Sequence, residues 1–224
     1  MDVRFLGHSC FELSDGDTKV LIDPFLTGNP RAAVSADELH PTTILLSHGH
    51  ADHFGDTISI ATRTGVEVVA TTELARELDE DGVTARDTNL GGTEEFEWGS
   101  VKLVPALHDS RTPKGGSNVA AGLVIDFKGT VVYHLGDTSL FSDLSLVGRR
   151  RAVDIAIIPI GGHYTMDRHD AVDAAEFVGA RTVIPCHYNT FPLIETDAQA
   201  FKTGVESATS STVTVLAPGD TFSA

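Results

Sequence analysis

The sequence is poor in the features that mark a membrane-bound, disulfide-stapled or exported protein. It holds two cysteines in 224 residues, Cys10 and Cys186, which are too few for a disulfide framework. No run approaches the roughly 20 apolar residues of a membrane helix. The first residues show no basic start, long apolar segment or small-residue cleavage site of an export signal. We therefore expect a cytoplasmic protein that does not bind a membrane.

Basic side chains are also scarce. The 16 Lys and Arg residues stand against 32 Asp and Glu residues, which gives a formal net charge of -16. Such a surface repels polyanions, so we expect no nucleic-acid partner. We expect a small-molecule substrate instead, and a small anion remains compatible because bound cations would set the local field.

The chain has no internal repeat, low-complexity tract or linker, and its 21 Gly and 9 Pro residues are spread along its length. We therefore expect a single domain over residues 1–224, with one sizeable core. Strand-rich domains of this size commonly associate, so a homo-oligomer is a further expectation.

Short apolar runs alternate with turn residues and with two predicted helices, at about 72–81 and 169–178. The chain opens with three such runs, at 3–6, 10–13 and 19–22, which resemble an antiparallel meander. Later strand-like runs, at 43–46 and 182–185, end in histidines. Mixed strand directions with flanking helices predict an α/β fold of two packed mixed β-sheets flanked by helices.

The pattern His48-x-His50-x-Asp52-His53 places three histidines and an aspartate within six residues. In an extended segment, His48 and His50 project to the same side and can reach one cation, while Asp52 and His53 follow the turn and can reach a neighbouring one. Imidazole and carboxylate suit zinc, manganese or iron. A surface His-rich loop or a closed structural metal site is the alternative interpretation.

This pattern resembles the metal motif of the metallo-β-lactamase superfamily. The later residues His108, Asp137 (preceded by Gly136) and His187 resemble the remaining ligands of that superfamily. The resemblance implies a four-layer αββα metallo-β-lactamase fold, in which one metal binds to His48, His50 and His108. It implies a second metal on Asp52, His53 and His187, with Asp137 and a hydroxide between the two.

Further segments narrow the resemblance to one group. They are Gly7-His8-Ser9-Cys10-Phe11, Leu21-Ile22-Asp23-Pro24, Pro159-Ile160-Gly161-Gly162 and His187-Tyr188-Asn189-Thr190-Phe191-Pro192. They are similar to the small, single-domain metal-dependent hydrolases near the ascorbate-phosphate lactonase branch. The name of that family describes a site and not a substrate, and fold analogy supplies no substrate either.

The predicted enzyme is a metal-dependent hydrolase with two divalent metal ions, zinc first, with manganese or iron as alternatives. A hydroxide bound to both metals would cleave a small ester, lactone or phosphodiester. The carboxylates of Asp52 and Asp137 are the predicted catalytic groups, which orient the hydroxide and shuttle its proton. The alternatives are an iron-dependent oxidoreductase on the same scaffold and a non-catalytic metal-binding protein.

Three residues are predicted to contact the substrate or support the ligands: His8, Asp23 and His163. Asp23 is expected to accept a hydrogen bond from a ligand histidine. His134 alternates within an apolar strand and is expected to be structural. Cys186 precedes His187 but is expected to be a core thiol, and His40 and His169 are expected at a loop and a helix start.

Overall fold

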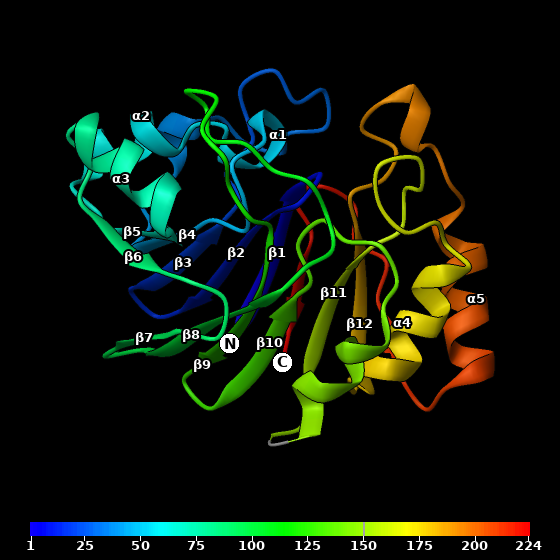
Figure 1. Cartoon of the computed structure of the whole chain (residues 1–224). Helices are drawn as coiled ribbons and strands as arrows, with labels where there is room; N and C mark the ends of the chain where they lie inside the picture. The colour runs from blue at the N-terminus through cyan, green and yellow to red at the C-terminus, as the bar shows by residue number, and fades with distance from the viewer. Residues whose placement is uncertain (150) are drawn as a thin grey trace.

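A computed structural model describes residues 1–149 and 151–224 and has two seven-stranded sheets (Figure 1). The first sheet has the strand order β14-β1-β2-β3-β4-β5-β6. Its first four strands pair antiparallel, and β3, β4, β5 and β6 pair parallel. The strands are β1 (Asp2–Gly7), β2 (Cys10–Asp15), β3 (Thr18–Ile22), β4 (Thr43–Leu45), β5 (Val68–Thr71), β6 (Ala85–Thr88) and β14 (Thr221–Ser223).

The second sheet has the order β13-β12-β11-β10-β9-β8-β7 and is also mixed. Strands β7 to β10 pair antiparallel, and β10 to β13 pair parallel. The strands are β7 (Thr93–Phe96), β8 (Gly99–Pro105), β9 (Ala121–Phe127), β10 (Thr130–His134), β11 (Ile155–Pro159), β12 (Thr182–Cys186) and β13 (Thr212–Val213). The expectation of two mixed sheets is therefore confirmed.

Helices lie on the outer face of each sheet (Figure 1). The first sheet carries α2 (Thr57–Thr64) and α3 (Thr72–Glu80), and the second carries α4 (Asp170–Val178) and α5 (Ala198–Ala208). The remaining helical segments are α1 (Ala51–Phe54), η1 (Ala36–Glu38), η2 (Ser142–Arg149) and η3 (Pro192–Ile194). In the part of the chain that the structure describes, no helix combines the length and apolar character that crossing a membrane requires.

The main core lies between the two sheets. It joins Phe11 and Leu13 of β2 to Val101 of β8 and to Ile125 and Phe127 of β9, all of them fully buried. Alternate residues of each strand face this layer, and the opposite faces pack on the helices. The two-sided burial explains why strands such as β4 and β11 are apolar throughout.

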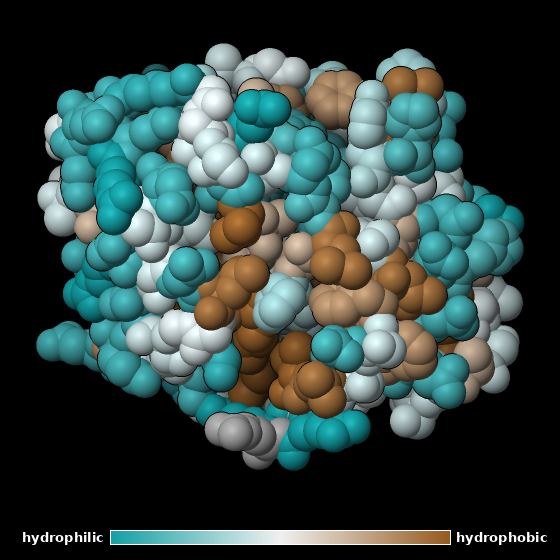
Figure 2. Space-filling view, viewed as in Figure 1, coloured by the Kyte–Doolittle hydropathy of each residue, from teal (hydrophilic) through white to brown (hydrophobic). Residues whose placement is uncertain are grey.

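An apolar hollow of about 630 Å³ lies on the outer face of β8, β9 and β10, beside η2. Val104, Val124, Phe141 and Leu146 are among the residues that line it. Figure 2 shows apolar residues gathered in the middle of the same view, with hydrophilic residues around them. No candidate metal ligand lines this hollow, so it is separate from the site described next.

Candidate metal centre

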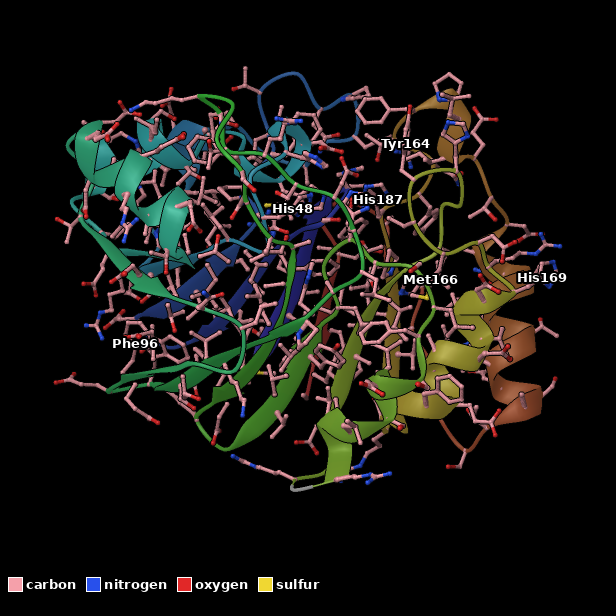
Figure 3. All side chains as sticks on the ribbon, in the orientation of Figure 1. His48, Phe96, Tyr164, Met166, His169 and His187 are labelled. Carbon is pink, nitrogen blue, oxygen red and sulfur yellow. The ribbon has the colours of Figure 1, made fainter. Side chains whose placement is uncertain are left out.

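The predicted ligands lie at one end of the two sheets, just beyond the carboxyl ends of their strands. The motif loop follows β4, and His108 follows β8. Asp137 and His187 follow β10 and β12. Figure 3 shows His48 and His187 near each other at this end of the molecule. Four strands from both sheets thus deliver their ligands to one region, and the core fixes the strand positions.

Three histidines form what we call the first group: His48, His50 and His108. One nitrogen from each lies within 4.8 Å of the others. His48 is buried and its Nε2 lies 3.0 Å from Nδ1 of His50, while its Nδ1 lies 3.0 Å from the hydroxyl of Ser47. Burial lowers the pKa of both His48 and His108. Neutral imidazoles with free lone pairs are the form that binds a cation.

The second group consists of Asp52, His53 and His187. Together with His8, these residues bring four ligand atoms within 4.8 Å of one another. Asp52 lies in the first turn of α1, and its Oδ2 is 3.8 Å from Nε2 of His187. The side chains of His53 and His187 are almost fully buried, whereas that of Asp52 is 32% exposed. The group therefore opens to solvent on the side of Asp52.

Asp137 lies between the two groups. Its Oδ2 is 3.1 Å from Nε2 of His187, 3.3 Å from Nε2 of His53 and 3.6 Å from Nε2 of His108. Its side chain is only 3% exposed. One carboxylate oxygen therefore faces imidazoles of both groups, the position that a bridging carboxylate would take.

The buried charges of the second group depend on one another. Burial alone would lower the pKa of His187, but the carboxylate of Asp137 outweighs it and raises that pKa to about 9. Burial likewise opposes a charged His53, and Asp137 and Asp23 raise its pKa well above the usual value. Burial would raise the pKa of Asp137, yet His187 and His53 hold it well below the usual range. Without a cation, the second group is a cluster of imidazolium and carboxylate ions.

The donor set fits a cation. Among the described residues, four buried side-chain atoms have no hydrogen-bond partner: Nε2 of His53, Oδ1 of Asp137, and both ring nitrogens of His187. Buried polar atoms are nearly always paired, and three candidate ligands supply all of these exceptions. Nitrogen and carboxylate oxygen suit zinc, manganese or iron.

The backbone around the site is adapted to this convergence. A Cβ at Gly49, between His48 and His50, would collide with the carbonyl of Arg111, and a Cβ at Gly136 would meet that of Ala121. Gly136 also has a φ of 65°. Both glycines let the main chain pass closely beside the ligands. His187 itself has a φ of 53°, a conformation that is uncommon for non-glycine residues.

Asp23 holds the motif loop in place through hydrogen bonds. It is fully buried, and one oxygen accepts a hydrogen bond from the N–H of Ser47 at 2.8 Å. Its other oxygen accepts from the Ser47 hydroxyl at 2.6 Å and from Nδ1–H of His53 at 2.7 Å. The carboxylate thus holds the ring of His53 with Nε2 directed toward Asp137.

The histidines outside the two groups differ in their burial and contacts. His134 is buried, with Nε2 3.1 Å from the carbonyl of Ser9, and its Nδ1 accepts the N–H of Gly136. His163 is exposed, and its ring lies edge-on to that of Tyr164. His40 is exposed in a loop, and His169 stands at the N-cap position of α4. Cys186 is buried in the core between the sheets.

Sequence reasoning missed two supporting side chains, Ser47 and Thr190. Ser47 links Asp23 to His48, and Thr190 Oγ1 lies 2.9 Å from Nδ1 of His8. Ser47 directly precedes the motif, which was a usable signal. Thr190 is 182 residues from His8 in the chain, so no local pattern could have joined them.

The chain is similar to known proteins over most of its length. The model of the beta-lactamase superfamily domain matches residues 2–187. A UPF0173 metal-dependent hydrolase of Natranaerobius thermophilus is 44% identical over 222 residues and 99% of each chain. One of Thermus thermophilus is 46% identical over 202 residues, or 90% of this chain and 89% of the relative. Among solved structures, the metallo hydrolase Igni18 of Ignicoccus hospitalis has a TM-score of 0.91 and 34% identity, covering 99% of this chain and 97% of that one.

Proposed function

The chain belongs to the beta-lactamase superfamily, among its UPF0173 metal-dependent hydrolases, and we propose that it uses two divalent cations to cleave a small ester, lactone or phosphodiester. The observation that carries this proposal is the arrangement of the candidate ligands. Two groups of side chains each bring ligand atoms within 4.8 Å of one another, Oδ2 of Asp137 faces imidazoles of both groups, and the buried atoms without partners belong to the second group and Asp137. A closed structural site would need only one such group.

The first group would hold one cation and the second group the other, with Asp137 between them. We propose zinc first, with manganese or iron as alternatives, because the donors are imidazole nitrogens and carboxylate oxygens without a thiolate. Cys186 stays outside the ligand set, since it is buried among core residues of the two sheets.

When bound, two such cations supply a hydroxide near neutral pH and polarise the oxygen of the scissile group. The two carboxylates of the chain differ in what they can do around that reaction. Asp137 is buried and faces three imidazoles, so it orients the reacting groups. Asp52 is partly exposed, so it can pass a proton on to solvent.

A small substrate fits both the charge of the chain and the rim of the site. The net charge of -16 disfavours an extended polyanion. Exposed side chains follow two strands of the second sheet, namely Leu107 beside His108 after β8, and His163 and Tyr164 after β11. We propose that His163 contacts substrate from this rim.

The experiment is elemental analysis of purified protein, combined with a panel of lactone, thioester, phosphomonoester and phosphodiester substrates. Turnover is measured before chelation, after chelation and after metal restoration. We expect about two metals per chain and chelator-sensitive turnover of one substrate class. Fewer than one metal per chain after reconstitution, with no turnover, would count against the proposal.

Asp137→Ala should abolish turnover and weaken binding of at least one cation, because it removes the carboxylate that faces both groups. Asp143→Ala is the matched control, since Asp143 is an exposed aspartate in η2. Full activity in Asp137→Ala would remove Asp137 from the mechanism.

A further inference from the structure

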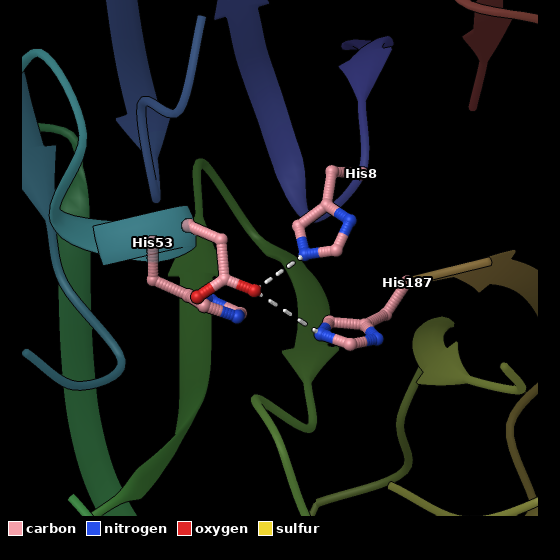
Figure 4. Close-up of side chains that lie close together, drawn as sticks. His8, His53 and His187 are labelled. Atoms are coloured by element: carbon pink, nitrogen blue, oxygen red, sulfur yellow. Dashed lines mark hydrogen bonds and ion pairs between the residues drawn. The ribbon is translucent and has the colours of Figure 1, made fainter. Parts of the chain in front are cut away.

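His8 lies beside the second group although it is distant in the chain from all three members of that group. It directly follows β1, and its side chain is fully buried. Its backbone has a φ of 60°, and its carbonyl accepts the N–H of His187 at 2.8 Å. This uncommon conformation brings the ring to within 4.1 Å of the ring of His187 (Figure 4).

Both nitrogens of the His8 ring already have partners. Nε2 lies 3.1 Å from Oδ2 of Asp52, and Nδ1 lies 2.9 Å from the hydroxyl of Thr190. An ionised carboxylate can only accept, so Nε2 carries the proton and donates to Asp52. Nδ1 then accepts the hydroxyl hydrogen of Thr190.

With a proton on Nε2 that is already donated to Asp52, His8 differs from the two histidines of the second group. Nε2 of His53 and Nε2 of His187 have no hydrogen-bond partner among the described residues, as expected of atoms that face a cation. The His8 ring is also held by aromatic contacts, since Phe25 and Phe191 each lie edge-on at 5.7 Å between centroids. The ring therefore cannot turn easily to offer a lone pair.

The carboxylate of Asp52 depends on His8 for its position. Its side chain is 32% exposed and sits on a helix of four residues. Among the described residues, His8 gives the one hydrogen bond to this carboxylate, since Nε2 of His187 is 3.8 Å away. Figure 4 marks both contacts with dashed lines.

We propose that His8 is a positioning residue for the second cation: it donates from Nε2 to Oδ2 of Asp52 and so fixes the carboxylate that binds the metal. This inference rests on the proposed function, because it assumes a cation in the second group. Groups that orient metal ligands through hydrogen bonds commonly set the affinity of the site. Thr190 acts indirectly: its hydroxyl donates to Nδ1 of His8 and so fixes the tautomer of that ring.

The test is calorimetric titration of zinc into metal-free protein, which measures binding without turnover. The wild type should show two affinities. His8→Ala should weaken one of them by roughly 10- to 100-fold and leave the other unchanged. Thr190→Val should weaken the same affinity by less, and Phe191→Leu is the control, because it alters packing on His8 but neither hydrogen bond.

His8→Gln separates a donor from a ligand, because its amide N–H can take the place of Nε2–H. Recovery of most of the lost affinity supports the proposal, and a loss equal to that of His8→Ala overturns it in favour of direct ligation. Unchanged affinities in His8→Ala also overturn it. If His8→Ala does not fold, as judged by its melting curve, Thr190→Val decides by the same criterion. A wild-type chain that binds no pair of cations would instead contradict the proposed function.

Discussion

Asp23 offers a substitution that changes charge and proton position while keeping the shape of the side chain. In Asp23→Asn, the amide oxygen can still accept the N–H of Ser47, but an NH₂ group replaces the oxygen that faces Nδ1 of His53. An NH₂ group cannot accept a hydrogen bond. Nδ1 of His53 must therefore accept, which leaves the ring proton on Nε2, the atom that faces Asp137.

Two effects follow from this change. A hydrogen bond to a charged group contributes about 1.5–3 kcal/mol, and for a chain of this size each kcal/mol shifts the melting temperature by about 2–4 °C. We therefore expect metal-free Asp23→Asn to melt about 3–12 °C below the wild type. The proton on Nε2 also blocks a candidate ligand, so binding of one cation should weaken by at least roughly 10- to 100-fold.

The assay combines melting of the metal-free protein with zinc titration, and NMR of the imidazole nitrogens identifies the tautomer of His53. Asp56→Asn is the matched control, because the Asp56 carboxylate also accepts two backbone N–H groups, from Leu26 and Thr27, but accepts from no candidate ligand. If Asp23→Asn binds both cations with wild-type affinity, Asp23 does not set the tautomer that His53 needs to bind a cation.

Three further predictions follow from other features of the chain. Asp137 raises the pKa of His187 from 6.5 to about 9, so the stability that the charged His187 ring contributes is fully present below pH 6.5. The melting temperature of metal-free protein should therefore fall as the pH rises from 6.5 through 9. A flat profile in chelator would contradict this. Burial raises the pKa of the thiols of Cys10 and Cys186, so a thiol reagent at pH 8 should label neither in folded protein and both after unfolding. His163→Ala should raise KM by about 2- to 10-fold, the worth of one hydrogen bond, with kcat unchanged; a change in kcat alone would contradict a rim contact.

Much of the fold was predictable because most strands carry a local signal. Strands β4, β11 and β12 are buried on both faces and appear in the sequence as short apolar runs. Strands β6 and β7 were missed, because their residues are half-exposed and include charged side chains. Pairing with β5 and β8 forms them, and the sequence of an edge strand records that pairing only weakly.

The candidate ligands were predictable for a related reason. Each comes directly after an apolar run or lies within the dense motif of three histidines and an aspartate, so local pattern and family resemblance together locate them. Their assignment to two cations stays a prediction. The supporting hydrogen bonds were less accessible, because His8 meets Asp52 across 44 residues and Thr190 across 182. Only the packing of the sheets brings those segments together.

The ligands of the two groups differ in how firmly neighbouring carboxylates and histidines hold them in place. In the second group, Asp23 holds His53 from a fully buried position and His8 holds Asp52. In the first group, the side chain of His50 is 31% exposed, and its nearest carboxylate, Asp109, is 3.9 Å away and itself exposed. Metal ligands held by fixed partners give tighter sites. We therefore expect the second group to hold its cation more tightly than the first group.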